Sequence, residues 1–142
     1  MKRVIFLLLT MMLLMPGVAN AQIQKTGSVK TETIASVRMG FVSLRKSEGR
    51  YYISFSTNNQ FDDRIILKLG DNKESAIQSL NDLIDILDSL QGNAIQYIDN
   101  GYGRELRLWK LMGALYISAD GYAGDANTSK GELKKFLSAL QK

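Results

Sequence analysis

The apolar residues of this chain change their spacing three times along its length, and this pattern constrains the fold more than any other feature. From residue 33 to 69 they tend to recur at every second position, as in half-buried β-strands. From residue 76 to 90 they follow the three- and four-residue spacing of an amphipathic helix. The same succession then repeats in the second half of the chain. The predicted order is therefore three strands and a helix, twice over.

Three strands are expected in the first half, at residues 33–44, 51–56 and 64–69. The first of them changes parity at Gly40, which predicts a β-bulge there. The helix that follows is expected to begin at a capping box, because Asp71 precedes Glu74 by three residues. Gly92 lies just after its last apolar position, where a left-handed residue commonly ends a helix.

Three further strands are expected in the second half, at residues 94–98, 105–109 and 115–119. Asn100 and Gly101 separate the first two, and this dipeptide strongly favours a hairpin turn. A Gly- and Asp-rich loop over residues 120–128 follows the last strand. Ser129 and Glu132 then have the spacing of a second capping box, which opens the C-terminal helix.

This order predicts an α+β fold with one antiparallel sheet of about six strands and both helices on one face. In element order alone, the meander-then-helix halves resemble the PUR and whirly types of single-strand nucleic-acid-binding domain, although no sequence motif of those families is present. The residues expected in the shared core are Val37, Phe41, Ile53, Phe55, Leu67, Leu80, Leu83, Ile84, Leu87, Leu106, Leu108, Leu115, Ile117, Leu133, Phe136 and Leu137.

The first 21 residues have the three parts of a secretory signal peptide. Lys2 and Arg3 form a positive n-region, residues 4–15 form an apolar run, and Ala19-Asn20-Ala21 forms a small-x-small cleavage site. The run is too short to span a bilayer as a helix, which needs about 20 residues. We therefore expect cleavage before Gln22, with no membrane span afterwards.

Removal of the signal would leave a loose polar leader over residues 22–32 and a single domain over residues 33–142. The chain contains no cysteine, so it has neither a lipid-attachment residue nor a disulfide framework. Small secreted animal domains usually depend on disulfides. An exported binding module of a bacterial periplasm, cell surface or secretome is the expectation.

The absence of histidine as well as cysteine removes many chemistries. Ser-His-Asp triads, cysteine nucleophiles and the usual zinc, copper and haem ligand sets are all excluded. The alternative function is a small hydrolase that uses paired carboxylates, because a glycosidase needs only two of them. The candidate pairs are Asp62 with Asp63, and Asp120 with Asp125. Loop aspartates more commonly serve turn geometry, so no catalytic residue is assigned.

A calcium loop is the other chemistry to consider. Asp125, Asn127 and Ser129 match the first three ligand positions of an EF-hand. The required glycine is one residue late, at Gly131, and the twelfth position holds Phe136 in place of a bidentate Glu. Neither a metal nor a cofactor is therefore predicted.

The feature that favours a ligand-binding function is an aromatic face on the predicted sheet. By strand parity the side chains that point away from the helices include aromatic, cationic and hydroxyl groups, with two more tyrosines in adjacent loops. Flat aromatic rings beside hydrogen-bond donors suit sugars, peptides or unstacked bases. The candidate ligand-binding residues are Trp109, Arg107, Tyr116, Tyr52, Lys68, Tyr102 and Tyr122.

The expected partner is accordingly a glycan, a peptide or a protein, and a second copy of the chain is an alternative cover for the same face. Without Lys2 and Arg3, 16 basic residues stand against 14 acidic ones, a net charge near +2. A nucleic-acid binder that uses the sheet as a platform is a further alternative, which this weak charge disfavours. The leading prediction is a small exported binding or interaction protein without catalytic activity.

Overall fold

The computed structural model describes residues 29–58 and 64–142. The signal segment, most of the leader, and Asp62 with Asp63 lie outside these residues. The α+β class is confirmed. The elements in chain order are β1 (Thr31–Val37), the short 3-10 helix η1 (Arg38–Gly40), β2 (Val42–Ser47), β3 (Arg50–Ser56), β4 (Arg64–Gly70), α2 (Lys73–Ser89), β5 (Ile95–Asp99), β6 (Glu105–Leu111), β7 (Ala114–Ala119), β8 (Ala126–Thr128) and α3 (Lys130–Gln141).

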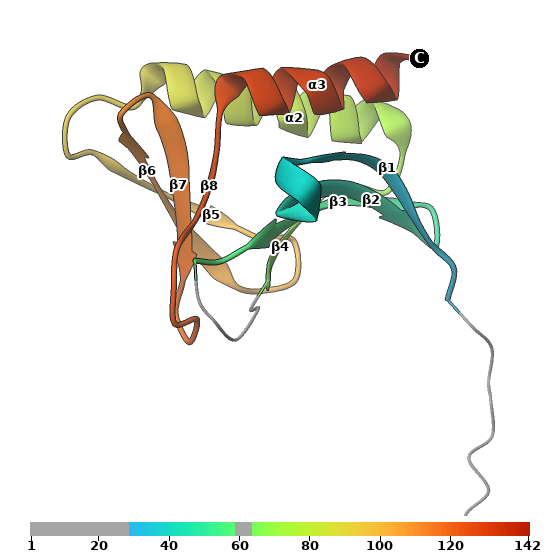
Figure 1. Ribbon diagram of the computed structural model, residues 1–142, viewed down its shortest axis with the longest axis horizontal. Helices are drawn as coiled ribbons and strands as arrows, with labels where there is room; N and C mark the ends of the chain where they lie inside the picture. The colour runs from blue at the N-terminus through green and yellow to red at the C-terminus, as the bar shows by residue number, and fades with distance from the viewer. Residues whose placement is uncertain (1–28, 59–63) are drawn as a thin grey trace, which may run out of the picture.

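The strands form two antiparallel sheets of four strands, in the orders β1-β2-β3-β4 and β5-β6-β7-β8. The prediction of a single six-stranded sheet was therefore wrong. Each half of the chain is one sheet followed by one helix. The two helices lie side by side above both sheets and run in opposite directions (Figure 1).

One extra strand comes from a hairpin inside the segment predicted as residues 33–44. β1 and β2 pair antiparallel, with Val37 opposite Val42, so the predicted bulge at Gly40 is a chain reversal. Arg38, Met39 and Gly40 all have positive φ. Two of these three residues are not glycine, and a left-handed conformation is uncommon for such residues. For this reason the residue types at these positions do not predict the turn.

The other extra strand is β8, which lies in the loop predicted over residues 120–128. It is only three residues long and pairs with β7, with Tyr116 opposite Asn127. A side chain from a distant part of the chain binds it: Arg38 donates to both the side-chain and the backbone oxygen of Asn127. Local sequence preference does not reveal a strand that long-range contacts specify.

Both helices begin at capping boxes. At α3, Ser129 and Glu132 bond each other's backbone N–H groups, as predicted. At α2 the cap is Asn72 with Ser75 in place of the predicted Asp71 with Glu74. Asp71 instead lies within 3.0 Å of the Lys68 ammonium, as an ion pair just before the helix.

One continuous apolar cluster joins the two sheets to the two helices. Most of the predicted core residues are buried in it, while Val37 and Leu137 are only partly buried against it. Phe41 was predicted to be buried, but 53% of its surface is exposed. It sits at the end of the η1 turn and not in a continuous strand, so strand parity does not apply to it.

The two sheets meet at Asn100, in the turn after β5. Its backbone carbonyl accepts a hydrogen bond from the Lys68 N–H at 2.8 Å, and its side-chain amide donates to the Ile66 carbonyl at 3.2 Å. Asn100 therefore ties the β5–β6 turn to the edge of β4. Among the described residues, no helix is long and apolar enough to cross a membrane.

Candidate ligand-binding face

The outward face of the β5–β8 sheet carries a row of side chains centred on Trp109. The strand register places Ile95, Trp109, Tyr116 and Asn127 directly opposite one another on four successive strands. The rings of Trp109 and Tyr116 stack, with centroids 5.7 Å apart and planes inclined by 26°. Opposed side chains on one sheet face are close enough to interact, so the row is a consequence of register.

The next row along the same face is more polar. It contains Tyr97, Arg107 and Ser118, again opposite one another on β5, β6 and β7. The guanidinium of Arg107 lies 2.7 Å from the carboxylate of Asp120. Both side chains are solvent-accessible, and Asp120 is 94% exposed. The face thus has an aromatic centre and a charged, hydrogen-bonding border.

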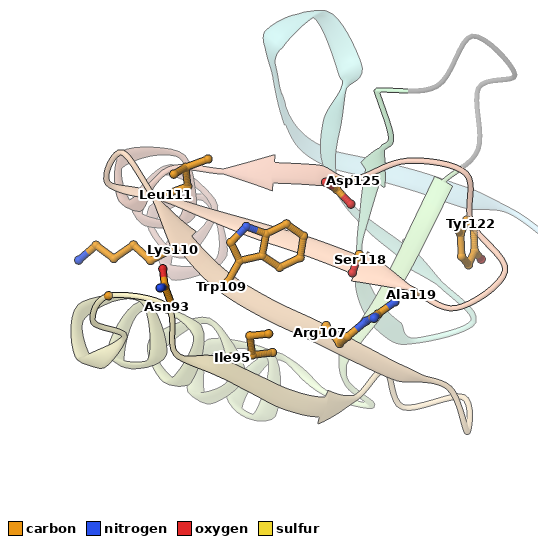
Figure 2. A pocket seen from close by; sticks show the side chains of 11 residues that line it. Asn93, Ile95, Arg107, Trp109, Lys110, Leu111, Ser118, Ala119, Tyr122 and Asp125 are labelled. Atoms are coloured by element: carbon orange, nitrogen blue, oxygen red, sulfur yellow. The ribbon is translucent and has the colours of Figure 1, made fainter.

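A hollow of about 540 Å³ is lined by Ile95 and Trp109 of the first row and by Arg107 and Ser118 of the second. Figure 2 shows the indole of Trp109 near its middle, with Arg107, Ser118 and Asp125 on one side of the indole and Lys110 and Leu111 on the other. Ligand pockets for small molecules have volumes of about 300–1,000 Å³. The hollow is therefore large enough for a ligand of one or two rings.

The predicted orientation of Trp109 is correct, because the neighbouring residues Leu108, Leu115 and Ile117 point into the core and are fully buried. Of the predicted site residues, Trp109, Arg107 and Tyr116 share this face, and Tyr122 lines the hollow. The ring of Tyr122 has the guanidinium of Arg104 4.9 Å from its centroid.

The remaining predicted residues are not brought to the hollow. Tyr52 and Lys68 lie opposite each other on β3 and β4, in the other sheet. Tyr102 is exposed in the turn between β5 and β6. The aromatic face drawn from one six-stranded sheet is thus divided between two sheets.

Sequence reasoning missed the contribution of β5 to this face. Ile95 and Tyr97 are each about half exposed beside Trp109 and Arg107. A turn centred on Asn100-Gly101, as predicted, would oppose Asp99 to Tyr102. The structure instead has a five-residue loop, residues 100–104, which opposes Asp99 to Glu105, so the predicted turn implied a different register for β5. Leu111, at the end of β6, is also exposed at the rim of the hollow.

The same geometry bears on the alternative chemistries. Among residues 29–58 and 64–142 no three acidic side chains gather as a metal site would need. In the EF-hand-like segment, Asn127 accepts from Arg38 and Ser129 caps α3. Asp120 is exposed and forms an ion pair with Arg107. It therefore lacks the desolvated surroundings of a carboxyl group that serves as a general acid.

Comparison with protein-family profiles, curated proteins and solved structures finds no match to this chain. The resemblance of element order to the PUR and whirly domains is accordingly unsupported by a structural match.

Proposed function

We propose that this protein is an exported binding module without catalytic activity, and that its ligand site is the outward face of the β5–β8 sheet around Trp109. The observation that carries the proposal is the indole lying across a hollow, stacked on Tyr116 and bordered by an ion pair. A partly exposed tryptophan next to a hydrogen-bonding border suits recognition of a ligand that is flat and partly polar.

The ligand class that these groups fit best is a saccharide. The face of an indole ring is electron-rich and attracts the weakly positive C–H groups on one face of a sugar ring. Arg107 and Asp120 offer donors and acceptors to hydroxyl groups at the ring edge. A hollow open to solvent also suits one or two residues of a longer glycan.

The test is a screen of soluble glycans against the purified protein, followed by titration with Trp109 fluorescence as the signal. Trp109 is the only tryptophan, so emission reports on this face alone. We expect a glycan that shifts the emission and whose binding is lost in Trp109→Ala. Phe41→Ala is the matched control, because Phe41 is an exposed aromatic residue outside the hollow.

Two results would contradict the proposal. One is binding that survives Trp109→Ala but is lost in Phe41→Ala. The other is glycan turnover that vanishes in Asp120→Ala or Asp125→Ala while the fold persists, which would favour the carboxylate hydrolase. If only peptides bind, the site stands and the saccharide class is wrong.

A further inference from the structure

Each of the two sheets has two edge strands, which gives four edges in the part of the chain that the structure describes. An edge strand exposes unpaired N–H and C=O groups to any strand that can pair with them. Proteins close such edges with bulges, charges, very short strands or covering segments. The four edges of this protein differ in whether they are closed.

Three of the edges are closed. β1 has a bulge between Thr33 and Ala35 and packs against α3. β4 is covered by the Asn100 turn, whose backbone and side chain bond two of its residues. β8 is three residues long and its backbone is bonded by the Arg38 side chain, while the preceding Asp125 carbonyl accepts from the Asn58 N–H at 3.0 Å.

β5 has none of these devices over most of its length. It has no bulge in its pairing with β6, and its single charged residue, Asp99, is at its end. Among the described residues, no backbone hydrogen bond joins the residues Ile95 to Asp99 to any element other than β6. Ile95 and Tyr97 on the outward face and Gln96 on the inward face are all exposed.

The hydrogen-bond alternation identifies which residues face the open edge. The Asn100 N–H bonds the Arg104 carbonyl at 2.8 Å, so counting back in twos assigns Ile98 and Gln96 to the β6 ladder. The backbone groups of Ile95 and Tyr97 then point to the open edge, whereas Asp99 lines a hollow that β5 shares with β4 and α2. Among the described residues, the Tyr97 carbonyl accepts only a long hydrogen bond, 3.4 Å, from the side-chain amide of its neighbour Gln96.

We propose that this edge pairs with β5 of a second copy of the chain, antiparallel and about a two-fold axis at Gln96. In that register Ile95 opposes the partner's Tyr97, and each Gln96 opposes the same residue of the other copy. Both pairs are complementary, apolar with aromatic and amide with amide. Antiparallel pairing also keeps the two Asp99 carboxylates at opposite ends, whereas parallel pairing would bring them together.

The partner is a second copy because the strand is complementary to itself in this register, as an isologous interface requires. The two β5–β8 sheets would form one sheet of eight strands. The row of Ile95, Trp109 and Tyr116 in one copy would then continue into the row of Tyr97, Arg107 and Ser118 in the other. This inference does not depend on the ligand of the Trp109 face, since it rests on the backbone edge.

The first experiment measures the mass of the purified protein by sedimentation equilibrium over a wide concentration range. We expect a reversible dimer, and Tyr97→Lys should raise its dissociation constant by about tenfold or more. Leu111→Lys is the matched control. Leu111 is 50% exposed against 52% for Tyr97, but it lies on an inner strand of the same sheet.

The second experiment tests the proposed strand register by disulfide cross-linking. The chain has no cysteine, so Gln96→Cys introduces a single thiol. Directly opposed residues of a non-hydrogen-bonded antiparallel pair have Cα atoms about 4.5 Å apart, within disulfide range. Gln96→Cys should therefore cross-link rapidly under mild oxidation, and Gln78→Cys, an exposed position on α2, should not.

A monomer at every concentration, with no faster cross-linking of Gln96→Cys than of Gln78→Cys, would overturn the proposal. So would a dimer that Leu111→Lys breaks and Tyr97→Lys leaves intact, because the copies would then associate through the face and not the edge. The first result leaves glycan binding at Trp109 unaffected, so it overturns the edge pairing alone. The second result would place a second copy over the hollow that Leu111 and Trp109 line, and would therefore count against both proposals.

Discussion

The ammonium group of Lys130, in the first turn of α3, lies 2.8 and 2.7 Å from the two carboxylate oxygens of Asp88, near the end of α2. This contact joins the end of one helix to the start of the other. The hydrogen bond from Lys130 and its positive charge lower the pKa of Asp88 below its ordinary value. The contact therefore gives the helix pair a small pH dependence.

The sign of that dependence follows from the lowered pKa. The carboxylate form of Asp88 stabilises the fold above the ordinary aspartate pKa of about 4, and this contribution is lost as the pH falls through the lowered value. Asp88→Asn should reduce the free energy of unfolding slightly at pH 7 and flatten its decline below about pH 4. Urea unfolding at several pH values measures this, with Asp85→Asn on the same helix as control. Identical pH profiles for wild type and Asp88→Asn would contradict it.

Leu83, on the buried side of α2, tests how the helix docks. Its side chain is 4% exposed within the common core. Leu83→Ala should lower the free energy of unfolding by about 2–5 kcal/mol, as truncation of a buried leucine does. Asp82→Ala, at the exposed neighbouring position, should stay near 0.5 kcal/mol. Denaturant titration separates the two, and equal small losses would mean that α2 does not pack as described.

The elements that the sequence predicted well are those whose pattern is local. The helical spacing from Ala76 to Leu87 and the alternation around Trp109 both depend on one face of one element being buried. A chain reversal after β5 was also predicted from local residues, but as a turn centred on Asn100-Gly101. The structure has a five-residue loop, residues 100–104, in which Gly101 and Gly103, and not Asn100, have positive φ. These features determined the class of the fold and the orientation of the central residue of the candidate site.

The features that the sequence did not reveal depend on contacts between distant segments. The η1 turn requires positive φ at Arg38 and Met39, and Arg38 at the same time binds Asn127 and Glu132. The division into two sheets depends on Asn100, which turns the chain and also covers the edge of β4. Neither arrangement leaves a periodic pattern in the sequence, so the predicted numbers of strands and sheets were wrong.

The strength of the stacking between Trp109 and Tyr116 can be measured as a coupling energy in a double-mutant cycle. Because Trp109 is only partly buried, Trp109→Ala should cost less than the roughly 3–5 kcal/mol expected for a fully buried aromatic residue. A double-mutant cycle with Tyr116→Ala should give a coupling energy of about 0.5–1.5 kcal/mol. The emission of Trp109 should shift toward the red in Tyr116→Ala as the indole becomes more exposed. A coupling energy of zero would mean that the two rings do not stack in solution.

Export can be tested independently of the fold. The positive n-region, the apolar run and the Ala19-Asn20-Ala21 site predict cleavage before Gln22. Mass spectrometry of the exported protein should find an N-terminus at Gln22, either free or cyclised to pyroglutamate. Ala21→Arg should block cleavage, whereas Gln24→Arg, beyond the site, should not. A chain that keeps Met1 in the membrane fraction would show that the segment is an uncleaved anchor.

Gly101 tests the close approach between the two sheets. It has a φ of +83°, and a Cβ atom there would lie 2.5 Å from the Cβ atom of Lys68 on β4. Gly103, in the same turn, has a φ of +80° but open space where its Cβ atom would be.

Alanine at either position carries the cost of a left-handed conformation, about 1–2 kcal/mol. Only Gly101→Ala must also push the turn away from β4, where Asn100 bonds Ile66 and Lys68. Gly101→Ala should therefore be the more destabilising variant by about 1 kcal/mol or more in urea unfolding, a typical cost of forced overpacking. Equal losses for the two variants would mean that the β5–β6 turn does not press against β4.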